Sequence, residues 1–220
     1  MQFEYDWPGA EREYERAIEL NPNSAEAHFQ YSEYLENVGR NTEGNKERDL
    51  AQALDPSHDY FSDASFHRIG NTIDQDRQSV EEKAPNDPFA LSVLGINYAT
   101  AGRYKESVEM WERCLTLYGW HDFANVLKRA EAKGGPKFAL EEWMWAGEEF
   151  FSQNHDDLAV VAMAYTYSSL GNKDRAFTWL DKAVAQRNWC IIYLKRDDVW
   201  DPLRSDPRFA DLLRRVGLPA

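Results

Sequence analysis

The stretch LGINYATAGRYKESVEMWERCLTLY, residues 94–118, decides the fold. Gly102 divides it where one helix must end and the next begin, because glycine adopts the left-handed turn at a helix C-terminus at little cost. After this glycine, apolar residues recur every three or four positions, and those before it form an apolar stripe at helical spacing, as on one face of an amphipathic helix. They are Leu91, Leu94, Ile96 and Tyr98 before it, and Tyr104, Val108, Trp111, Leu115 and Tyr118 after it. The stretch therefore predicts a pair of antiparallel helices.

The sizes of the side chains support the same pairing. Gly95, Ser107 and Cys114 are small and are expected where the two helices approach closely. The large residues Tyr98, Tyr104 and Trp111 are expected to fill the gaps between them. At such a position Cys114 is expected to be a buried, unreactive thiol. A single pair of this kind leaves an apolar face that only a further pair can cover, so we expect the pairs to stack.

Internal repeats are visible at two spacings. One set of residues recurs 34 positions later, and the two segments close as AIELNP and AQALDP. These pairs are Ala10/Gly44, Tyr14/Arg48, Ala17/Ala51, Leu20/Leu54 and Pro22/Pro56. A second set recurs after 69 positions, which is two such units plus one residue: Tyr98/Tyr167, Gly102/Gly171, Ser107/Ala176, Trp111/Leu180 and Cys114/Ala183. A repeat of this length is typical of helical solenoids.

These residues resemble the tetratricopeptide repeat, with its L-G, Y, G-x-Y, A, F, A and P pattern. Pro22, Pro56 and Pro85 match the closing proline, which cannot continue a helix. The resemblance implies an all-α fold, an α-α superhelix of antiparallel helix pairs with a C-terminal capping helix, in a single domain over 1–220. The predicted units are a half unit at 7–22, pairs at 25–56, 59–85, 88–118, 121–152 and 157–187, and a cap over 188–220.

Two of these units depart from the pattern. The unit at 59–85 is short and lacks the aromatic-rich first helix. The unit at 121–152 keeps an apolar second helix but not the spacing; its apolar residues are Phe138, Leu140, Trp143, Trp145, Phe150 and Phe151. We expect both units to keep the class of fold with altered local packing.

The C-terminal stretch carries the signals of a capping helix. Asp206 can cap a helix that Pro207 starts, with Arg214 and Arg215 in its last turn and Gly217 after it. The stretch also resembles the C-terminal tail of long bacterial tetratricopeptide repeat proteins, in which the repeats follow an effector such as a winged-helix DNA-binding module or a protein kinase. The sequence contains no such effector and begins inside a unit. We therefore expect the C-terminal part of a longer protein, or a trimmed descendant of one.

Composition and charge exclude several classes of protein and of partner. Hydrophobic residues at 43% and aromatic residues at 14% indicate a folded chain. Residues 1–87 carry 8 Lys and Arg against 20 Asp and Glu, so nearly all of the net charge of −13 lies there. Clustered cations that would displace counterions from a phosphate backbone are lacking, so a nucleic-acid partner is not expected. No apolar run is long enough to span a bilayer, no secretory signal is visible, and two cysteines are too few for a disulfide framework, so a reducing cytoplasm is expected.

The sequence contains none of the common catalytic motifs. The sequence has no Gly-rich phosphate loop, no HExxH, no GxSxG and no zinc spacing of cysteines. We therefore expect no enzyme, no cofactor and no metal. The cluster His155-Asp156-Asp157 is the one local group that can seed a metal site, but Asp156 is expected to cap a helix over 158–170. The pairs Glu141-Glu142 and Glu148-Glu149 are expected on a solvated face, and the tryptophans Trp111, Trp143, Trp145, Trp179, Trp189 and Trp200 in the core.

The resemblance also implies a binding surface, because the first helices of tetratricopeptide repeats line a concave groove. The residues at the family's contact positions are Glu26, Phe29, Glu33, Glu36 and Asn37; Phe89, Ser92, Ile96, Ala99 and Thr100; and Leu158, Val161, Tyr165, Ser168 and Ser169. We call these fifteen the concave-face residues. Because they include three glutamates, several aromatic or apolar residues and no lysine or arginine, a basic or apolar segment of a protein or peptide is the expected partner.

Two interpretations of this surface stay open. The first is a non-catalytic scaffold whose groove binds a peptide or partner segment. The second is a regulatory or sensor domain detached from a DNA-binding or kinase effector, with a small ligand as a further option. The half unit adds a separate expectation: Trp7, Tyr14 and Ile18 form an apolar side that no preceding helix covers. This N-terminal interface is expected to form a homodimer or to dock on the missing effector.

Overall fold

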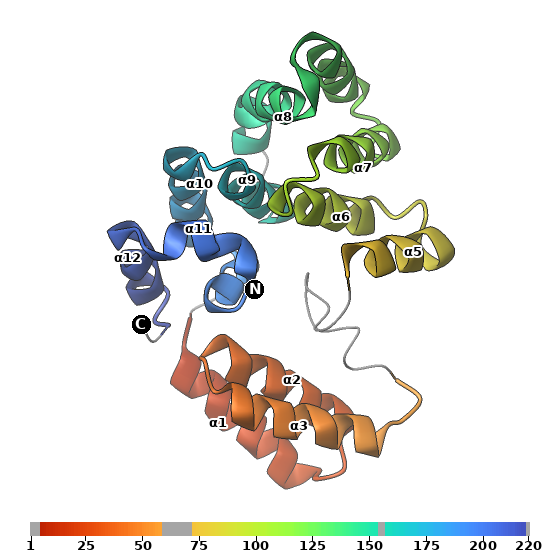
Figure 1. Cartoon of the computed structure of the whole chain (residues 1–220). Helices are drawn as coiled ribbons and strands as arrows, with labels where there is room; N and C mark the ends of the chain where they lie inside the picture. Colours follow the sequence, from red (N-terminus) through yellow and green to blue (C-terminus); the bar gives the residue numbers. More distant parts are fainter. Residues whose placement is uncertain (1–4, 59–71, 154–156, 219–220) are drawn as a thin grey trace. The chain divides into compact units, whose positions relative to one another are not determined.

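The computed structural model describes residues 5–58, 72–153 and 157–218, and in these ranges every regular element is helical (Figure 1). The α-helices are α1 Trp7–Leu20, α2 Ala25–Asn37, α3 Asn41–Leu54, α5 Ile73–Lys83, α6 Pro88–Thr100, α7 Tyr104–Leu117, α8 His121–Gln153, α9 Asp157–Ser169, α10 Lys173–Ala185, α11 Asp201–Arg204 and α12 Pro207–Arg215. Two 3₁₀ helices, η1 Trp189–Lys195 and η2 Asp198–Trp200, lie between α10 and α11. The predicted all-α fold is confirmed.

The chain forms two compact units. Unit 1 combines Met1–Gly70 with Arg187–Asp198 and Arg204–Ala220. Unit 2 combines Asn71–Gln186 with Val199–Leu203. Each unit therefore contains a piece of the C-terminal stretch. The single domain over 1–220 stays a prediction.

Unit 1 is built on the pair α2–α3, with α1 packed against α2. Ser24 caps α2 by accepting a hydrogen bond of 3.2 Å from the Ala27 amide. Gly39, with φ of +87°, ends the helix in the left-handed conformation, and the Arg40 amide donates to the Leu35 carbonyl at 2.7 Å. The apolar side of α1 packs on a core cluster of α2 made of Tyr31, Tyr34 and Leu35.

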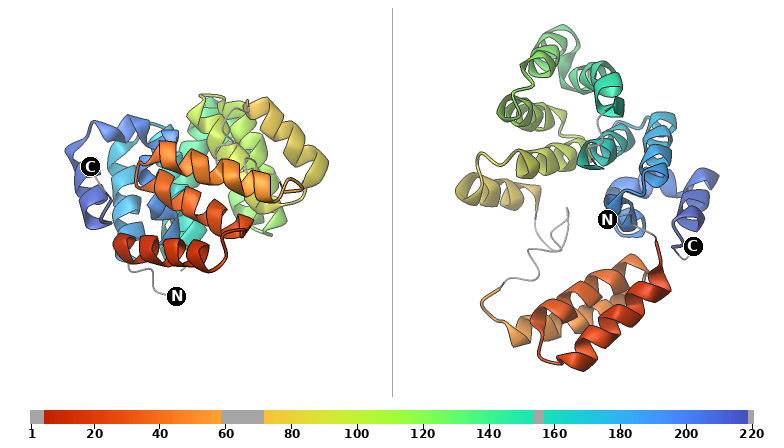
Figure 2. Two further views of the ribbon diagram at one scale, coloured as in Figure 1. Left: turned by 90° about the horizontal axis from the view of Figure 1, so that it is seen from below. Right: turned by 180° about the vertical axis from the view of Figure 1, so that it is seen from behind.

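Unit 2 contains the predicted pairs at 88–118 and 157–187, as α6–α7 and α9–α10 (Figure 2). At the first turn Gly102 has φ of +73°, and the Arg103 amide donates to the Tyr98 carbonyl at 2.8 Å. At the second, Gly171 has φ of +81°, and the Asn172 amide donates to the Tyr167 carbonyl at 2.9 Å. The predicted glycine stops are therefore confirmed in both pairs.

The close approach predicted within α6–α7 is also present. Ser107 donates a hydrogen bond of 2.7 Å to the Gly95 carbonyl, which joins the two helices. A Cβ atom at Gly95 would lie 2.8 Å from Nε1 of Trp111, so only glycine fits against this ring. The indole of Trp111 in turn contacts that of Trp143 on α8, with ring centroids 4.5 Å apart. Trp111 therefore lies between its own pair and the next helix, as predicted.

The unit predicted at 121–152 is the single element α8, broken at Gly135. This glycine has φ of 83° and ψ of 178°, and Pro136 starts the second helical stretch, where its missing N–H costs nothing. The break resets the phase of the apolar pattern, which accounts for the irregular spacing in the sequence. The second stretch buries Ala139, Leu140, Trp143, Met144, Gly147 and Phe151.

The core prediction for the tryptophans is wrong at one position. Trp111, Trp143, Trp179 and Trp200 are buried, but Trp145 is 69% exposed. Successive helical residues are rotated by about 100°. Trp145 therefore points away from the side on which Trp143 is buried. Phe150, another apolar residue of this helix, is exposed beside the buried Phe151. The side chain of Trp189 lies outside the described part.

The helix predicted near the C-terminus is present as α12, and its role as a cap on the repeats stays a prediction. Asp206 accepts a hydrogen bond of 3.0 Å from the Arg208 amide, Pro207 is the first helical residue, and Gly217 follows with φ of +70°. In the short unit, α5 begins with a capping box between Thr72 and Gln75. The rest of that unit, over 59–71, lies outside the described residues, as do His155 and the predicted helix cap Asp156.

Candidate functional site

The concave-face residues of α2 lie in different surroundings. Glu26 is exposed and accepts a hydrogen bond of 2.8 Å from Gln30. Phe29 packs against Ala51 of α3 and is buried inside the helix pair. Glu33, Glu36 and Asn37, at the C-terminal end of the helix, lie together and are largely buried.

Glu33 and Glu36 are held by two arginines. From α3, Arg48 reaches Oε1 of Glu33 at 2.8 Å and Oε1 of Glu36 at 2.5 Å. From the residue after η1, Arg196 reaches Oε2 of Glu33 at 2.7 Å and Oε2 of Glu36 at 3.4 Å. Each carboxylate thus has one oxygen facing each guanidinium. Two negative and two positive charges balance, so the network is neutral. We call these four residues the Arg48–Arg196 network.

The network is buried in unit 1. Arg48 is only 1% exposed. Burial opposes the charge on Arg196, and the Glu33 and Glu36 carboxylates more than offset this, so the pKa of Arg196 lies above its ordinary value. The two glutamates expected to attract a basic partner therefore already have basic partners within their own chain. One signal for this is visible in the sequence, the lone arginine of α3 at position 48, and no signal is visible for Arg196.

The concave-face residues of α9 contact the short segment Val199–Trp200. The rings of Tyr165 and Trp200 are stacked with centroids 4.4 Å apart, and Ser168 donates a hydrogen bond of 2.7 Å to the Val199 carbonyl. Val161 is buried, and the side chain of Leu158 lies outside the described part.

The concave-face residues of α6 are partly open. Ile96 and Ala99 are buried, whereas Phe89 is 41% exposed and Ser92 is half-buried. The hydroxyls of Thr100 on α6 and Ser169 on α9 lie 2.7 Å apart, so these two first helices meet directly. Among the concave-face residues with described side chains, Phe89 is the large apolar residue that is most exposed to solvent.

The predicted N-terminal interface lies largely against its own chain. Trp7, Tyr14 and Ile18 are half-buried on the core cluster of α2. Nε1 of Trp7 also donates a hydrogen bond of 2.6 Å to the carbonyl of Val216, the residue that follows α12. These contacts leave less of the apolar side free than the sequence indicated. Self-association through this helix stays a prediction.

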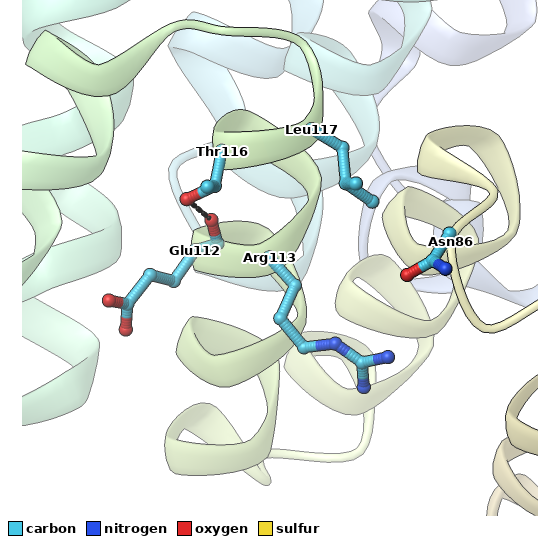
Figure 3. Close-up of a pocket in the computed structure, with 5 residues that line it drawn as sticks. All are labelled: Asn86, Glu112, Arg113, Thr116 and Leu117. Carbon is cyan, nitrogen blue, oxygen red and sulfur yellow. Dashed lines mark hydrogen bonds between the residues drawn. The ribbon is translucent and has the colours of Figure 1, made fainter.

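An open pocket of about 260 Å³ lies elsewhere, between the turn before α6 and the end of α7 (Figure 3). Its lining residues are Asn86, Glu112, Arg113, Thr116 and Leu117. Arg113 reaches Glu81 at 2.5 Å and donates to the Pro85 carbonyl at 2.9 Å, and Glu112 pairs with Lys128. Because its charged groups are already engaged, this pocket offers little to an incoming polar ligand.

The solvated-face prediction for the acidic pairs of α8 is wrong for one residue. Glu148 accepts hydrogen bonds from the Tyr167 hydroxyl at 2.6 Å and from Arg175 at 2.5 Å. Burial and the bond to Glu148 raise the pKa of Tyr167 above its ordinary value. Glu141 and Glu149 are exposed and Glu142 is half-buried.

Over 5–58, 72–153 and 157–218, no three metal-ligating side chains gather at one point, and no helix could cross a membrane.

Cys114 should resist alkylation until unit 2 unfolds. The thiol is buried and donates to the Pro88 carbonyl at 3.3 Å, and burial raises its pKa to about 12. In a Cys190→Ser background at pH 8, iodoacetamide should react with the folded protein more than about a hundredfold more slowly than with the urea-unfolded protein. The stabilisation from the neutral thiol is fully present below the pKa of the unfolded thiol and is lost as pH rises toward 12. Equal alkylation rates in both states would contradict the buried position.

Comparison with protein families gives three matches, each to a model described as tetratricopeptide repeat. They cover residues 13–44, 90–119 and 159–187. The first begins within α1 and ends within α3, the second spans the α6–α7 pair, and the third the α9–α10 pair. No curated protein matches the chain.

Proposed function

Because this chain is a tetratricopeptide repeat protein, and such repeats generally serve as protein–protein interaction modules, we propose that it is a non-catalytic scaffold. In this proposal a segment of a partner protein binds along the concave-face residues of α6, next to the contact with α9. The repeat family is typically non-catalytic, which agrees with the lack of catalytic motifs in the sequence.

One observation carries the proposal. In each unit, concave-face residues already contact an irregular piece of the C-terminal stretch: Glu33 contacts Arg196 in unit 1, and Tyr165 contacts Trp200 in unit 2. Both contacts use side chains that a foreign segment can also supply. The corresponding face of α6 ends in the exposed ring of Phe89, which can receive an apolar side chain in the same way.

The partner segment is proposed to be apolar at this point. Its anchor would pack on Phe89, and the hydroxyls of Ser92 and Thr100 would lie beside it. The apolar character of the partner segment is inferred from the residues of this surface, since neither Lys nor Arg lies among the concave-face residues of α6. A large apolar anchor in a small pocket is the usual source of affinity in such interfaces.

Site-specific photo-crosslinking tests this function. A benzoyl-phenylalanine placed at Phe89 should capture a partner in cells of the host, and mass spectrometry should locate the captured segment. Leu117 on α7 is the matched control, because it is also apolar and 44% exposed but lies outside the concave-face residues. A synthetic copy of the segment should bind the wild-type chain at least about tenfold more tightly than Phe89→Ala, a loss of about 1.4 kcal/mol. Capture at Leu117 alone, or equal binding by both proteins, would refute the proposed surface.

A further inference from the structure

The outer face of α8 carries an exposed tryptophan that the packing of unit 2 does not explain. Trp145 is 69% exposed, and it is the one tryptophan among the large exposed apolar residues of the described chain. It points away from the buried side of its helix, which holds Leu140, Trp143 and Met144. A ring this large gains nothing for the fold while it faces water.

Four glutamates surround this tryptophan on the helix surface. Side chains three and four positions away on either side are neighbours on a helix, and here they are Glu141, Glu142, Glu148 and Glu149. Glu148 accepts a hydrogen bond from the Tyr167 hydroxyl and forms an ion pair with Arg175. Of the others, Glu149 accepts a bond of 3.3 Å from Gln153, and none has an ion pair with a lysine or arginine in the described parts of the chain. The indole of Trp145 therefore has carboxylates on both sides that no lysine or arginine of the described chain compensates.

Aromatic rings elsewhere in this protein hold cations. The ammonium of Lys182 lies 4.9 Å from the ring centroid of Trp179, and the guanidinium of Arg103 lies 4.7 Å from that of Tyr98. No such cation lies over Trp145 among the described residues. Tryptophan gives the strongest cation–π attraction of the three aromatic residues, and nearby carboxylates add to it.

We propose that Trp145, with Glu141, Glu142 and Glu149, binds an arginine of a basic protein segment. The planar guanidinium stacks on the indole and donates charge-assisted hydrogen bonds to the flanking carboxylates. Charge complementarity selects this occupant, because the helix surface around the ring of Trp145 is acidic. Arginine fits better than lysine because a compact ammonium cannot stack on the ring and reach carboxylates on both sides. This surface lies on α8, apart from the concave-face residues, and does not depend on the proposed function.

Two peptides of equal charge, hexa-arginine and hexa-lysine, test the proposal. The indole N–H signals of the ¹⁵N-labelled chain are recorded by NMR, and Trp145→Phe assigns the signal of interest. Hexa-arginine should shift the Trp145 signal saturably and bind at least about tenfold more tightly than hexa-lysine. Trp145→Ala should lose about tenfold in affinity for hexa-arginine, and Glu141→Gln combined with Glu149→Gln should lose at least as much. Because Trp145 is exposed, its removal should leave the thermal unfolding curve unchanged.

The control removes the same charge from another place. Glu13 and Glu15 are exposed on α1, and Glu13→Gln combined with Glu15→Gln should leave hexa-arginine binding unchanged. Equal affinity for the two peptides, with no effect of Trp145→Ala, would reduce the interaction to counterion attraction by a chain of net charge −13 and overturn the proposal. A dimer in light scattering that Trp145→Ala abolishes would also overturn it, because a second copy would then be the occupant.

Discussion

Replacing Trp111 with alanine is expected to lower the free energy of unfolding of unit 2 by about 3–5 kcal/mol, the usual range for truncating a large aromatic residue in a core. The ring is 4% exposed and lies between Gly95 of α6 and Trp143 of α8. Its loss opens a cavity at the junction of three helices. Gly95 has no side chain that could fill this space, and Trp143 loses its contact with the Trp111 ring. Urea unfolding followed by circular dichroism measures the change.

Trp145→Ala is the matched control for this prediction. Trp145→Ala also removes a tryptophan side chain, but from a position on α8 where most of the ring already faces water. Its cost should be within about 0.5 kcal/mol, as for most surface substitutions. Glu142→Gln, on the same outer side, should also have almost no effect. A loss below about 1 kcal/mol in Trp111→Ala would mean that the ring does not lie at the helix junction.

The helix pairs could be predicted because local rules determine them. Gly102 and Gly171 end their helices through their own backbone conformation, and the apolar positions around them repeat with the period of a helix. The same reasoning failed at Trp145. The expectation that the tryptophans lie in the core took no account of the rotation from one helical residue to the next. Gly135 and Pro136, which restart the helix, set the phase that decides which ring is buried.

The surroundings of the concave-face residues could not be predicted from the repeat. Glu33 is bound by Arg196, 163 positions later in the sequence, and Tyr165 is covered by Trp200, which belongs to no helix pair. A repeat pattern describes each unit and its neighbours only. It carries no information on where a non-repeating C-terminal stretch will lie. The positions of the helices were therefore predictable, while the accessibility of the concave-face residues was not.

Arg48→Met should cost about 3–5 kcal/mol in the stability of unit 1, because breaking a buried ion network leaves a charge without compensation. Methionine replaces most of the aliphatic stem, so the loss of packing is small and the loss of charge dominates. Without Arg48, one guanidinium on Arg196 faces the two carboxylates of Glu33 and Glu36. One buried negative charge then remains unbalanced.

Adding Glu36→Gln to Arg48→Met should recover part of this loss. The double variant keeps one carboxylate, on Glu33, and one guanidinium, on Arg196, which lie 2.7 Å apart and balance each other. Glu36→Gln alone leaves two guanidiniums against one carboxylate, so it should also destabilise. The two substitutions should therefore couple by about 1–3 kcal/mol in a double-mutant cycle measured by urea unfolding. If their effects instead add within about 0.5 kcal/mol, Arg48 and Glu36 are independent in solution, and the Arg48–Arg196 network is not formed there.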